Sequence, residues 1–284
     1  MKSAPVVPVL LALCLSLLPA KARPAESPAV WRISDGTRLG FHDILEDLEN
    51  SSLVFVGELH DRPEIHRMQL KIIEALHRRG RRPLAVGLEM FRKEDQKALD
   101  DWVAGKTPEE EFEKIYLRNW NFPWSLYRDI FVFARDRGIP LVGLNVPPEI
   151  TRKVAREGFA ALTEEERGRL PMVTCRVDSA YMEFIRRAHG SHGHHGGDFE
   201  HFCEAQLVWD TAMAHRLVEL LEARPDHTVV VLAGTGHAWK PGIPDQIRFL
   251  NEELTYRVVL PAIQGRLEEE SVSPRDADYL WLEF

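Results

Sequence analysis

Two acids and two histidines follow directly behind apolar segments of this sequence, where their side chains could bind a ligand or act on water. Glu58 and His60 lie in VFVGELHDRPEIH, Glu89 lies in GLEMF, and His237 lies in AGTGHAWKPGIP. Carboxylates and imidazoles bind divalent metals and transfer protons at neutral pH. Each residue alone also has an ordinary structural role, such as accepting helix N–H groups or lying in a loop. Together the four residues favour a functional site.

Buried strands alternate with helices along the chain and would position these residues. The apolar runs 53–56, 84–88, 141–145, 228–233 and 256–261 are each preceded by helical sequence. Continuous apolar strands indicate a parallel sheet that is covered on both faces. The predicted fold class is therefore α/β, a mostly parallel sheet flanked by helices with a small inserted helical subdomain. Since parallel strands end at one rim, residues that follow the strands should meet in one crevice.

The lengths of the connections set the predicted domain organisation. Residues 28–284 form one α/β domain, and helical insertions at about 92–130 and 150–204 form a small subdomain on the rim of the sheet. An amphipathic helix with Phe41 on its apolar face precedes the first strand, and a second helix spans 63–79. The terminal segment ADYLWLEF is expected to form an edge strand.

Five further polar residues are placed to support the crevice. His66 and Gln69 lie one turn apart on the helix 63–79, Asn145 ends the third strand, and Gln206 and Asp210 are four residues apart on one helix face. Each could orient His60 or His237 from behind. Buried hydrogen bonding without a functional role is an equal alternative for them.

Aromatic residues gather near the same rim. They are Phe91, Trp102, Trp120, Phe122, Trp124 and Trp239. Such residues usually form core, but beside a polar crevice they could wall a large flat ligand. We assign Phe91 and Trp239 to ligand binding.

The stretch HGSHGHHGGDFEHF at 189–202 holds five of the twelve histidines and is rich in glycine. This composition predicts a mobile loop. His192, His194 and His195 could capture Zn, Ni or Cu, although such a loop lacks a preorganised site. A solvated linker is the simpler interpretation.

The first 22 residues have the pattern of an export signal. They combine a lysine, an apolar stretch and the small residues Ala20 and Ala22 at a cleavage site. Cys14 would accept a lipid only if it were retained, and Leu13 before it fits a lipid-acceptor signal poorly. We expect an exported protein of the periplasm or cell envelope, anchored at the outer membrane only through Cys14. Cys175 and Cys203 would be the mature cysteines and could pair in an oxidising compartment.

The net charge of the chain limits the kinds of partner that it would bind. The whole chain has a formal charge of −8, and loss of a signal with two lysines and no acid would make the mature charge about −10. This acidity disfavours nucleic acid or an anionic membrane surface as the main partner.

Five ordered segments resemble one known family. GELHDRPEIHRMQ, GLEMFRKEDQKAL, LVGLNVP, AQLVWDTAMA and AGTGHAWKPGIP are similar to motifs of the ChaN-like haem-binding uptake family, in the superfamily of the Tiki proteases and erythromycin esterases. The similarity runs from about residue 35 to 265. It implies an envelope protein of iron acquisition, often lipid-anchored, that binds haem and forms a homodimer with haems at the interface.

One departure from the family pattern concerns the iron ligand. The family motif resembles GHxxYGxGIP, and Lys240 occupies the position of its tyrosine. A tyrosine ligand therefore cannot be assigned here, whereas His60 and His237 match the family and imidazole is an ordinary haem ligand.

Two functions follow as hypotheses. The preferred one is haem binding, with His60 or His237 as axial ligand. The alternative is a metal-dependent hydrolase in which Glu58, His60, Glu89 and His237 hold Zn, Mn or Co and Glu58 or Glu89 acts as the catalytic base. The alternative gives the two acids a role that haem binding alone does not give them.

Overall fold

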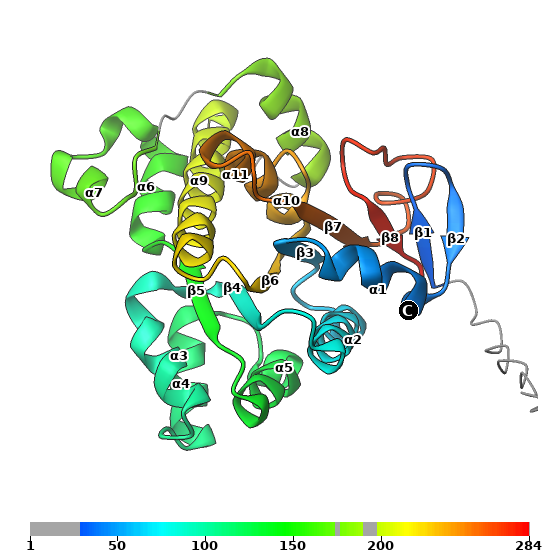
Figure 1. The fold of residues 1–284 in the computed structure, drawn as a ribbon. Helices are drawn as coiled ribbons and strands as arrows, with labels where there is room; N and C mark the ends of the chain where they lie inside the picture. Colours follow the sequence, from blue (N-terminus) through cyan, green and yellow to red (C-terminus); the bar gives the residue numbers. More distant parts are fainter. Residues whose placement is uncertain (1–28, 174–176, 190–197, 284) are drawn as a thin grey trace, which may run out of the picture.

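The computed structural model describes residues 29–173, 177–189 and 198–283, and its centre is a mixed, mostly parallel sheet of eight strands (Figure 1). In spatial order the strands are β2 (Thr37–Leu39), β1 (Val30–Arg32), β8 (Tyr279–Trp281), β7 (Tyr256–Pro261), β3 (Leu53–Glu58), β6 (Thr228–Gly234), β4 (Leu84–Arg92) and β5 (Leu141–Asn145). Helices flank both faces of this sheet, so the predicted α/β class is confirmed.

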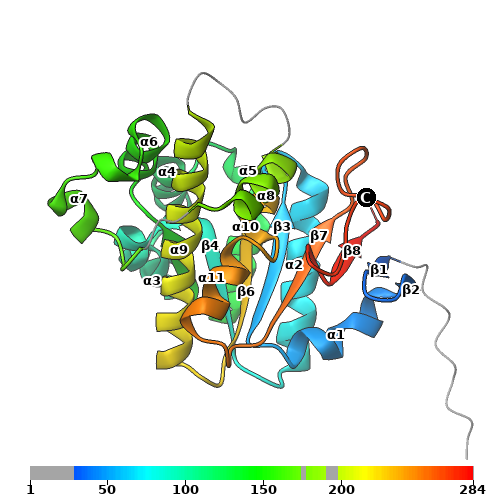
Figure 2. The same ribbon diagram turned by 90° about the horizontal axis from the view of Figure 1, so that it is seen from above.

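The helices form two layers. In chain order they are α1 (Phe41–Glu49), α2 (Pro63–Arg79), α3 (Gln96–Val103), α4 (Glu109–Asn119), α5 (Trp124–Arg137), α6 (Pro148–Glu157), α7 (Glu164–Gly168), α8 (Ser179–His189), α9 (Phe199–Ala223), α10 (Thr235–Ala238) and α11 (Ile243–Leu250), with 3-10 turns η1 (Lys93–Asp95) and η2 (Phe159–Ala161). Side chains of α1 to α5 share one core with one face of the sheet, and side chains of α8, α9 and α11 share a second core with the other face. Figure 2 shows α9 and α11 on one side of the sheet and α2 on the other.

Strand β3 shows why its sequence is apolar throughout. Val54 and Val56 belong to the core beneath α2, whereas Leu53 and Phe55 belong to the core beneath α9 and α11. Successive strand residues point to opposite faces, and both faces of this strand are covered. A run without polar alternation is therefore what a central strand requires.

The sheet changes winding direction between β3 and β6. Strand β3 continues into α2 on one face, and β6 continues through α10 into α11 on the other face. The two strands are parallel neighbours, with Glu58 paired to Gly234 at their carboxyl ends. Ligands of open α/β sheets bind outside the carboxyl ends of strands at such a switch point. The topology thus places a ligand site beside Glu58 and Gly234.

The end of the sheet near the chain termini differs from the prediction. Strand β8 pairs with β7 on one side and with β1 on the other, so the prediction of a terminal edge strand is wrong. The hairpin of β1 and β2 covers it. Each strand of this hairpin has three residues, which are too few to give a periodic sequence signal.

The two helical insertions differ in their packing. Residues 93–119 contain η1, α3 and α4, which join the core beneath α2 through Leu99, Trp102 and Phe112. The segment from α6 to α7 packs on α9 through a small separate cluster of Ile150, Val154, Leu162 and Ala205. Figure 1 shows α6 and α7 beyond α9, away from the sheet.

The start of α9 corrects part of the predicted histidine-rich loop. Asp198 caps the helix by accepting the backbone N–H of Glu200 at 2.9 Å, and the helix begins at Phe199. The prediction of a loop over 189–202 is therefore wrong for its last four residues, 199–202, and for His189, which ends α8. His192, His194 and His195 lie outside the described residues.

Other predictions for the chain ends also fall outside the described residues. They concern the export signal of residues 1–22, the lipid acceptor Cys14 and the second cysteine Cys175. Cys203 is described and is a buried free thiol. Among the described residues, every helix is too short or too polar to cross a membrane.

Candidate functional site

Glu58 is a buried carboxylate held by three donors. It ends β3 and is 1% exposed. His60 Nδ1 and the Tyr127 hydroxyl donate to its Oε1 at 2.7 and 2.5 Å, and Gln69 Nε2 donates to its Oε2 at 2.7 Å. Burial raises the pKa of Glu58, but the hydrogen bond and charge of His60 outweigh burial, so the pKa lies below its usual value. Glu58 is therefore an ionised anchor for its neighbours.

His60 is the more accessible of the two predicted histidines. Its side chain is 29% exposed, and its ring lies 4.9 Å from the Trp120 ring and 5.1 Å from the Phe122 ring. Because ionised Glu58 can only accept a hydrogen bond, Nδ1 of His60 carries the proton. Within the described part of the chain, Nε2 has no hydrogen-bond partner.

Gly234 leaves the space that His60 occupies. A Cβ at Gly234 would lie 3.2 Å from His60 Nε2 and 3.0 Å from His60 Cε1, which is tighter than ordinary contact. A side chain at this position would displace the imidazole. Burial lowers the pKa of His60, but the Glu58 hydrogen bond and the nearby charges of Glu58 and Glu89 raise it above its usual value overall.

His237 is held from the opposite side by Asp210. It lies on α10, and its Nδ1 is 2.6 Å from Asp210 Oδ1. The Tyr181 hydroxyl donates to the other oxygen of Asp210 at 2.8 Å. Burial lowers the pKa of His237, but the charges of Glu89 and Asp210 outweigh burial and raise the pKa to about 9. Burial raises the pKa of Asp210 as well, so the two buried groups hold a proton between His237 Nδ1 and Asp210 Oδ1.

Glu89 sits where regular strand pairing stops. The register of β4 against β5 shifts after Leu88, and Glu89 is the next residue. Its Oε2 accepts the Gly234 backbone N–H at 2.6 Å, and its Oε1 lies 3.8 Å from His237 Nε2. Asn145 supports this irregular backbone by donating to the Glu89 carbonyl at 2.7 Å.

These residues meet in one cleft of about 510 Å³ at the carboxyl ends of β3, β4 and β6. The cleft is lined by Glu58, Leu59, His60, Asp61, Glu89, Trp120, Phe122, Ala188, Gln206, Trp209, Gly234, Thr235, Gly236, His237 and Arg266. Its volume is within the roughly 300–1,000 Å³ of small-molecule sites. The structure thus brings together the four residues that follow separate strands in the sequence.

The supporting residues divide into two groups. Gln69 and His66 lie behind Glu58, and His66 packs at 4.1 Å on the Tyr127 ring with a pKa lowered by burial. Gln206 lines the cleft itself, and its buried Oε1 has no partner among the described residues. Asp210 holds His237 directly.

The carboxylates and imidazoles of the cleft do not form a preorganised metal site among the described residues. Among the described residues, no group of three or more His, Cys, Asp or Glu side chains is arranged to hold a metal ion. Both oxygens of Glu58 already accept hydrogen bonds from protein donors. The structure therefore gives no support to the predicted Zn, Mn or Co site at Glu58, His60, Glu89 and His237.

Two aromatic assignments need correction. Phe91 is fully buried and stacks on the Phe112 ring, and Trp239 is 3% exposed and packs on Phe184. Neither lines the cleft, because both side chains point into a core. Of the six aromatic residues named from the sequence, Trp120 and Phe122 alone line it.

Lys240, which replaces the tyrosine of the family motif, also points elsewhere. Its Nζ contacts Asp278 at 2.7 Å and donates to the Pro274 carbonyl at 2.9 Å. Lys240 thus tethers the segment before β8 and does not line the cleft.

Three contributors were not found from the sequence. Tyr127 and Tyr181 donate to the buried acids from the first turn of α5 and from α8, where a tyrosine looks like an ordinary core residue. Arg266 lines the cleft from a turn after β7. None of the three directly follows a strand, so the rule that residues after parallel strands meet at one rim could not identify them.

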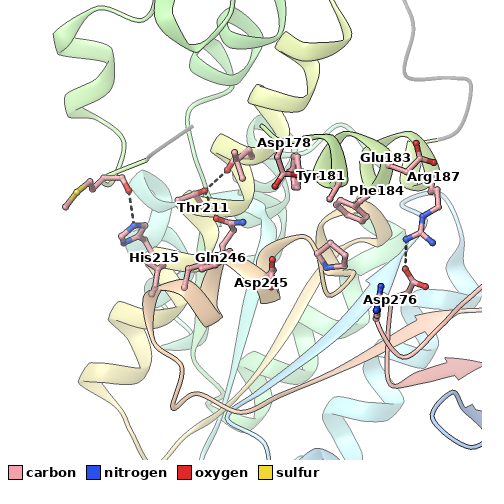
Figure 3. Close-up of a pocket in the computed structure, with 17 residues that line it drawn as sticks. Asp178, Tyr181, Glu183, Phe184, Arg187, Thr211, His215, Asp245, Gln246 and Asp276 are labelled. Atoms are coloured by element: carbon pink, nitrogen blue, oxygen red, sulfur yellow. Dashed lines mark hydrogen bonds and ion pairs between the residues drawn. The ribbon is translucent and has the colours of Figure 1, made fainter. Parts of the chain in front are cut away.

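A larger hollow of about 810 Å³ lies between α8, α9 and α11 (Figure 3). Arg187 and Asp276 form an ion pair at one end of it, and His215 lies at the other end. None of the residues predicted for the site lines this hollow. Tyr181 borders it while donating to Asp210, so the hollow adjoins the support of His237.

The fold and the cleft define an α/β protein with a ligand site at the switch point of its sheet. The chain belongs to the haem-binding uptake family of the Tiki superfamily, ChaN, whose model matches residues 44–247 and so includes Glu58, His60, Glu89 and His237.

A solved structure of the same family agrees with this fold, and a second structure has a lower similarity. A structure described as cofacial heme binding to ChaN of Campylobacter jejuni has a TM-score of 0.72 and 18% identity, covering 89% of this chain and 95% of that chain. An erythromycin esterase, EreC, in its open conformation has a TM-score of 0.48 and 15% identity over 82% of this chain and 76% of that chain. Among curated protein sequences, no match is found.

Proposed function

We propose that this chain is an exported haem-binding protein of the cell envelope, and that the cleft between β3, β4 and β6 is its haem site. Membership of a haem-binding uptake family supports the ligand. The signal-like first 22 residues support export, and the family resemblance supports a homodimer.

The observation that carries the proposal is the state of His60. Its Nδ1–H is fixed by ionised Glu58, which leaves Nε2 as the nitrogen with a free coordination position beside the cleft. Metal-binding histidines are commonly oriented by a carboxylate in this way, which makes the other nitrogen a stronger donor. Haem would supply an iron that accepts an imidazole as axial ligand.

The surroundings of His60 fit a flat, partly apolar ligand. Trp120 and Phe122, from the segment between α4 and α5, pack against the imidazole, and Gly234 leaves room for it by lacking a side chain. His237 is the weaker candidate for the axial ligand. Its side chain is 8% exposed, against 29% for His60, and its Nε2 lies 3.8 Å from Glu89 Oε1.

Absorption spectroscopy tests the proposal. Hemin added to the purified protein should give a shifted Soret band that saturates, and His60→Ala should lose or shift the band because the axial nitrogen is gone. His77→Ala, on the last turn of α2 at the opposite end of the sheet, is the matched control and should behave as wild type. An unchanged titration in both His60→Ala and His237→Ala would refute the proposed site.

Histidines of the 189–202 stretch could bind hemin nonspecifically, so a second control is needed. The triple variant His192→Ala, His194→Ala and His195→Ala should keep the wild-type band. Loss of the band in this variant, with the band kept in His60→Ala, would show that haem binds at these histidines and not in the cleft.

A further inference from the structure

Arg266 is a partly buried cation without a counter-charge. It lines the cleft that holds His60 and Glu89, and its buried Nε has no hydrogen-bond partner among the described residues. Burial alone shifts its pKa, downward, with no contribution from a nearby carboxylate. Other half-buried arginines of this chain are neutralised, as Arg257 is by both oxygens of Asp47. A partly buried guanidinium with an unpaired buried Nε costs free energy that a hydrogen-bonding ligand would offset.

The acids next to Arg266 in the sequence are used elsewhere. Glu268 accepts the backbone N–H of Gly265 at 2.8 Å, and Glu269 forms an ion pair with Arg38. Asp61, which also lines the cleft, lies beside Arg62 at 3.8 Å. Carboxylates therefore lie close to Arg266 in the sequence, but among the described residues none of them forms an ion pair with it.

A tight turn fixes the backbone at Arg266. Ile263 and Leu267 exchange two backbone hydrogen bonds of 2.8 Å, and the Arg266 N–H donates to the Ile263 carbonyl at 3.0 Å. Gly265 adopts a φ of 72°, which a glycine supplies without strain, and Leu267 is fully buried. The guanidinium is thus presented from an anchored position rather than from a loose loop.

We propose that Arg266 binds a carboxylate of the ligand in the cleft, so that this site selects porphyrins that carry free acid groups. The inference rests on the proposed function, because it assigns the group on haem that Arg266 contacts, a propionate. A guanidinium offers two parallel N–H donors that match a carboxylate. Arg266 lies beyond residues 44–247, which the family model matches, so the family match does not assign it.

The proposal also gives the charges of the cleft separate roles. Glu58 and Glu89 lie with the two imidazoles at the strand ends, where a positive iron would be stabilised. A carboxylate near those acids would be repelled. Arg266, from the turn after β7, provides the opposite charge for the acidic edge of the ligand.

Hemin and the iron complex of protoporphyrin dimethyl ester form the matched ligand pair for a test. The ester keeps the iron and the ring but removes both negative charges. The dissociation constants of both ligands are measured by Soret titration on the full chain, for wild type, Arg266→Gln, Arg266→Lys and the control Arg78→Gln. Arg78 is exposed at the far end of α2 and carries the same charge change.

We expect wild type and Arg78→Gln to bind hemin roughly 10- to 100-fold more tightly than the ester, the range for a hydrogen bond to a charged group. Arg266→Gln should bind the two ligands equally, and Arg266→Lys should fall between. The wild-type comparison needs no substitution, so it remains decisive if a variant fails to fold.

The outcomes separate the two proposals. If wild type binds hemin and the ester equally, or if Arg266→Gln keeps the full preference for hemin, the role of Arg266 is refuted while haem binding stands. If wild type gives no saturable Soret shift with either ligand, the proposed function itself fails and the role of Arg266 fails with it.

Discussion

At the scale of single residues, the site depends on how each histidine nitrogen is used. His60 and His237 each give Nδ1 to a buried carboxylate, but their remaining nitrogens differ. His60 lines the cleft with its side chain 29% exposed, and its Nε2 has no hydrogen-bond partner among the described residues, whereas Nε2 of the buried His237 lies 3.8 Å from Glu89. Two histidines that look equivalent in the sequence therefore have different chemistry.

Replacing the carboxylate behind His60 tests this distinction. Glu58→Gln keeps the shape of the side chain but removes the charge and puts an N–H₂ group where donors already point. We expect haem affinity to fall by about 10- to 100-fold, as for other partners of metal-binding histidines. The measurement is a Soret titration, with exposed Glu46→Gln as the control.

Haem affinity equal to wild type in a folded Glu58→Gln protein would show that His60 needs no anionic partner. Folding of the variant is checked by circular dichroism. We expect a loss of stability too, since three donors would lose a charged acceptor.

At the scale of elements, the site lies where β3 and β6 end and the chain continues into helices on opposite faces of the sheet. Helix α2 brings Gln69 to Glu58, and helix α9 brings Asp210 to His237. The cleft is thus fixed by two helices that pack in different cores. Movement of α2 would shift the support of His60, and movement of α9 would shift the support of His237.

Asp47 ties three elements together at the other end of the sheet. It accepts bonds of 2.6 and 2.7 Å from Arg257 on β7 and of 2.6 Å from Tyr279 on β8, and it lies on α1. Because about a third of its side chain is exposed, solvent screening reduces the value of these bonds. We expect Asp47→Asn to cost about 1 kcal/mol of unfolding free energy.

The pH dependence of this loss follows from the pKa of Asp47. Burial raises the pKa, but the Arg257 and Tyr279 hydrogen bonds outweigh burial and hold it below its usual value. The contribution is therefore complete above the unfolded pKa of about 3.9 and disappears as the pH falls through the lower folded pKa. Urea unfolding of wild type and Asp47→Asn at pH 6 and pH 3 measures it.

The difference between wild type and Asp47→Asn should be largest at pH 6 and should shrink at pH 3. The control Asp129→Asn, with a 78% exposed side chain, should change little at either pH. A difference for Asp47→Asn that grows toward acid would contradict the assigned ion pair.

The sequence predicted the elements that carry strong periodicity. Strands β3 to β7 and helices α1 and α2 could be located because their residues are uniformly buried or alternate with a helical period. The hairpin β1–β2 and the interior place of β8 could not, because three-residue strands take their structure from their neighbours.

Only the site residues that directly follow strands could be predicted from the sequence. Glu58, Glu89 and His237 follow from the rule that parallel strands end at one rim. Phe91 was misplaced because the bulged end of β4 turns its ring into the core, and Trp239 because α10 turns it toward α8. The placement of Arg266 in the cleft depends on the turn at 263–267, and no local sequence pattern predicts where that turn lies in space.

At the scale of the whole molecule, a single architecture accounts for the family match and for the cleft. The sheet supplies a common rim, the two helix layers seal its faces, and the switch between β3 and β6 leaves the rim open where the histidines lie. The family model spans the segments from α1 to α11 that build this rim. Haem binding at the rim by His60 is the central claim.

Electron–nuclear double resonance of the ferric haem complex tests this claim most directly, because it detects the nucleus bound to iron. The full chain would be labelled with ¹⁵N-histidine, and wild type, His60→Ala and His237→Ala would be compared. We predict a histidine ¹⁵N coupling in wild type and in His237→Ala that is absent in His60→Ala. A wild-type complex without histidine coupling, or one whose coupling survives in His60→Ala, would contradict the assignment.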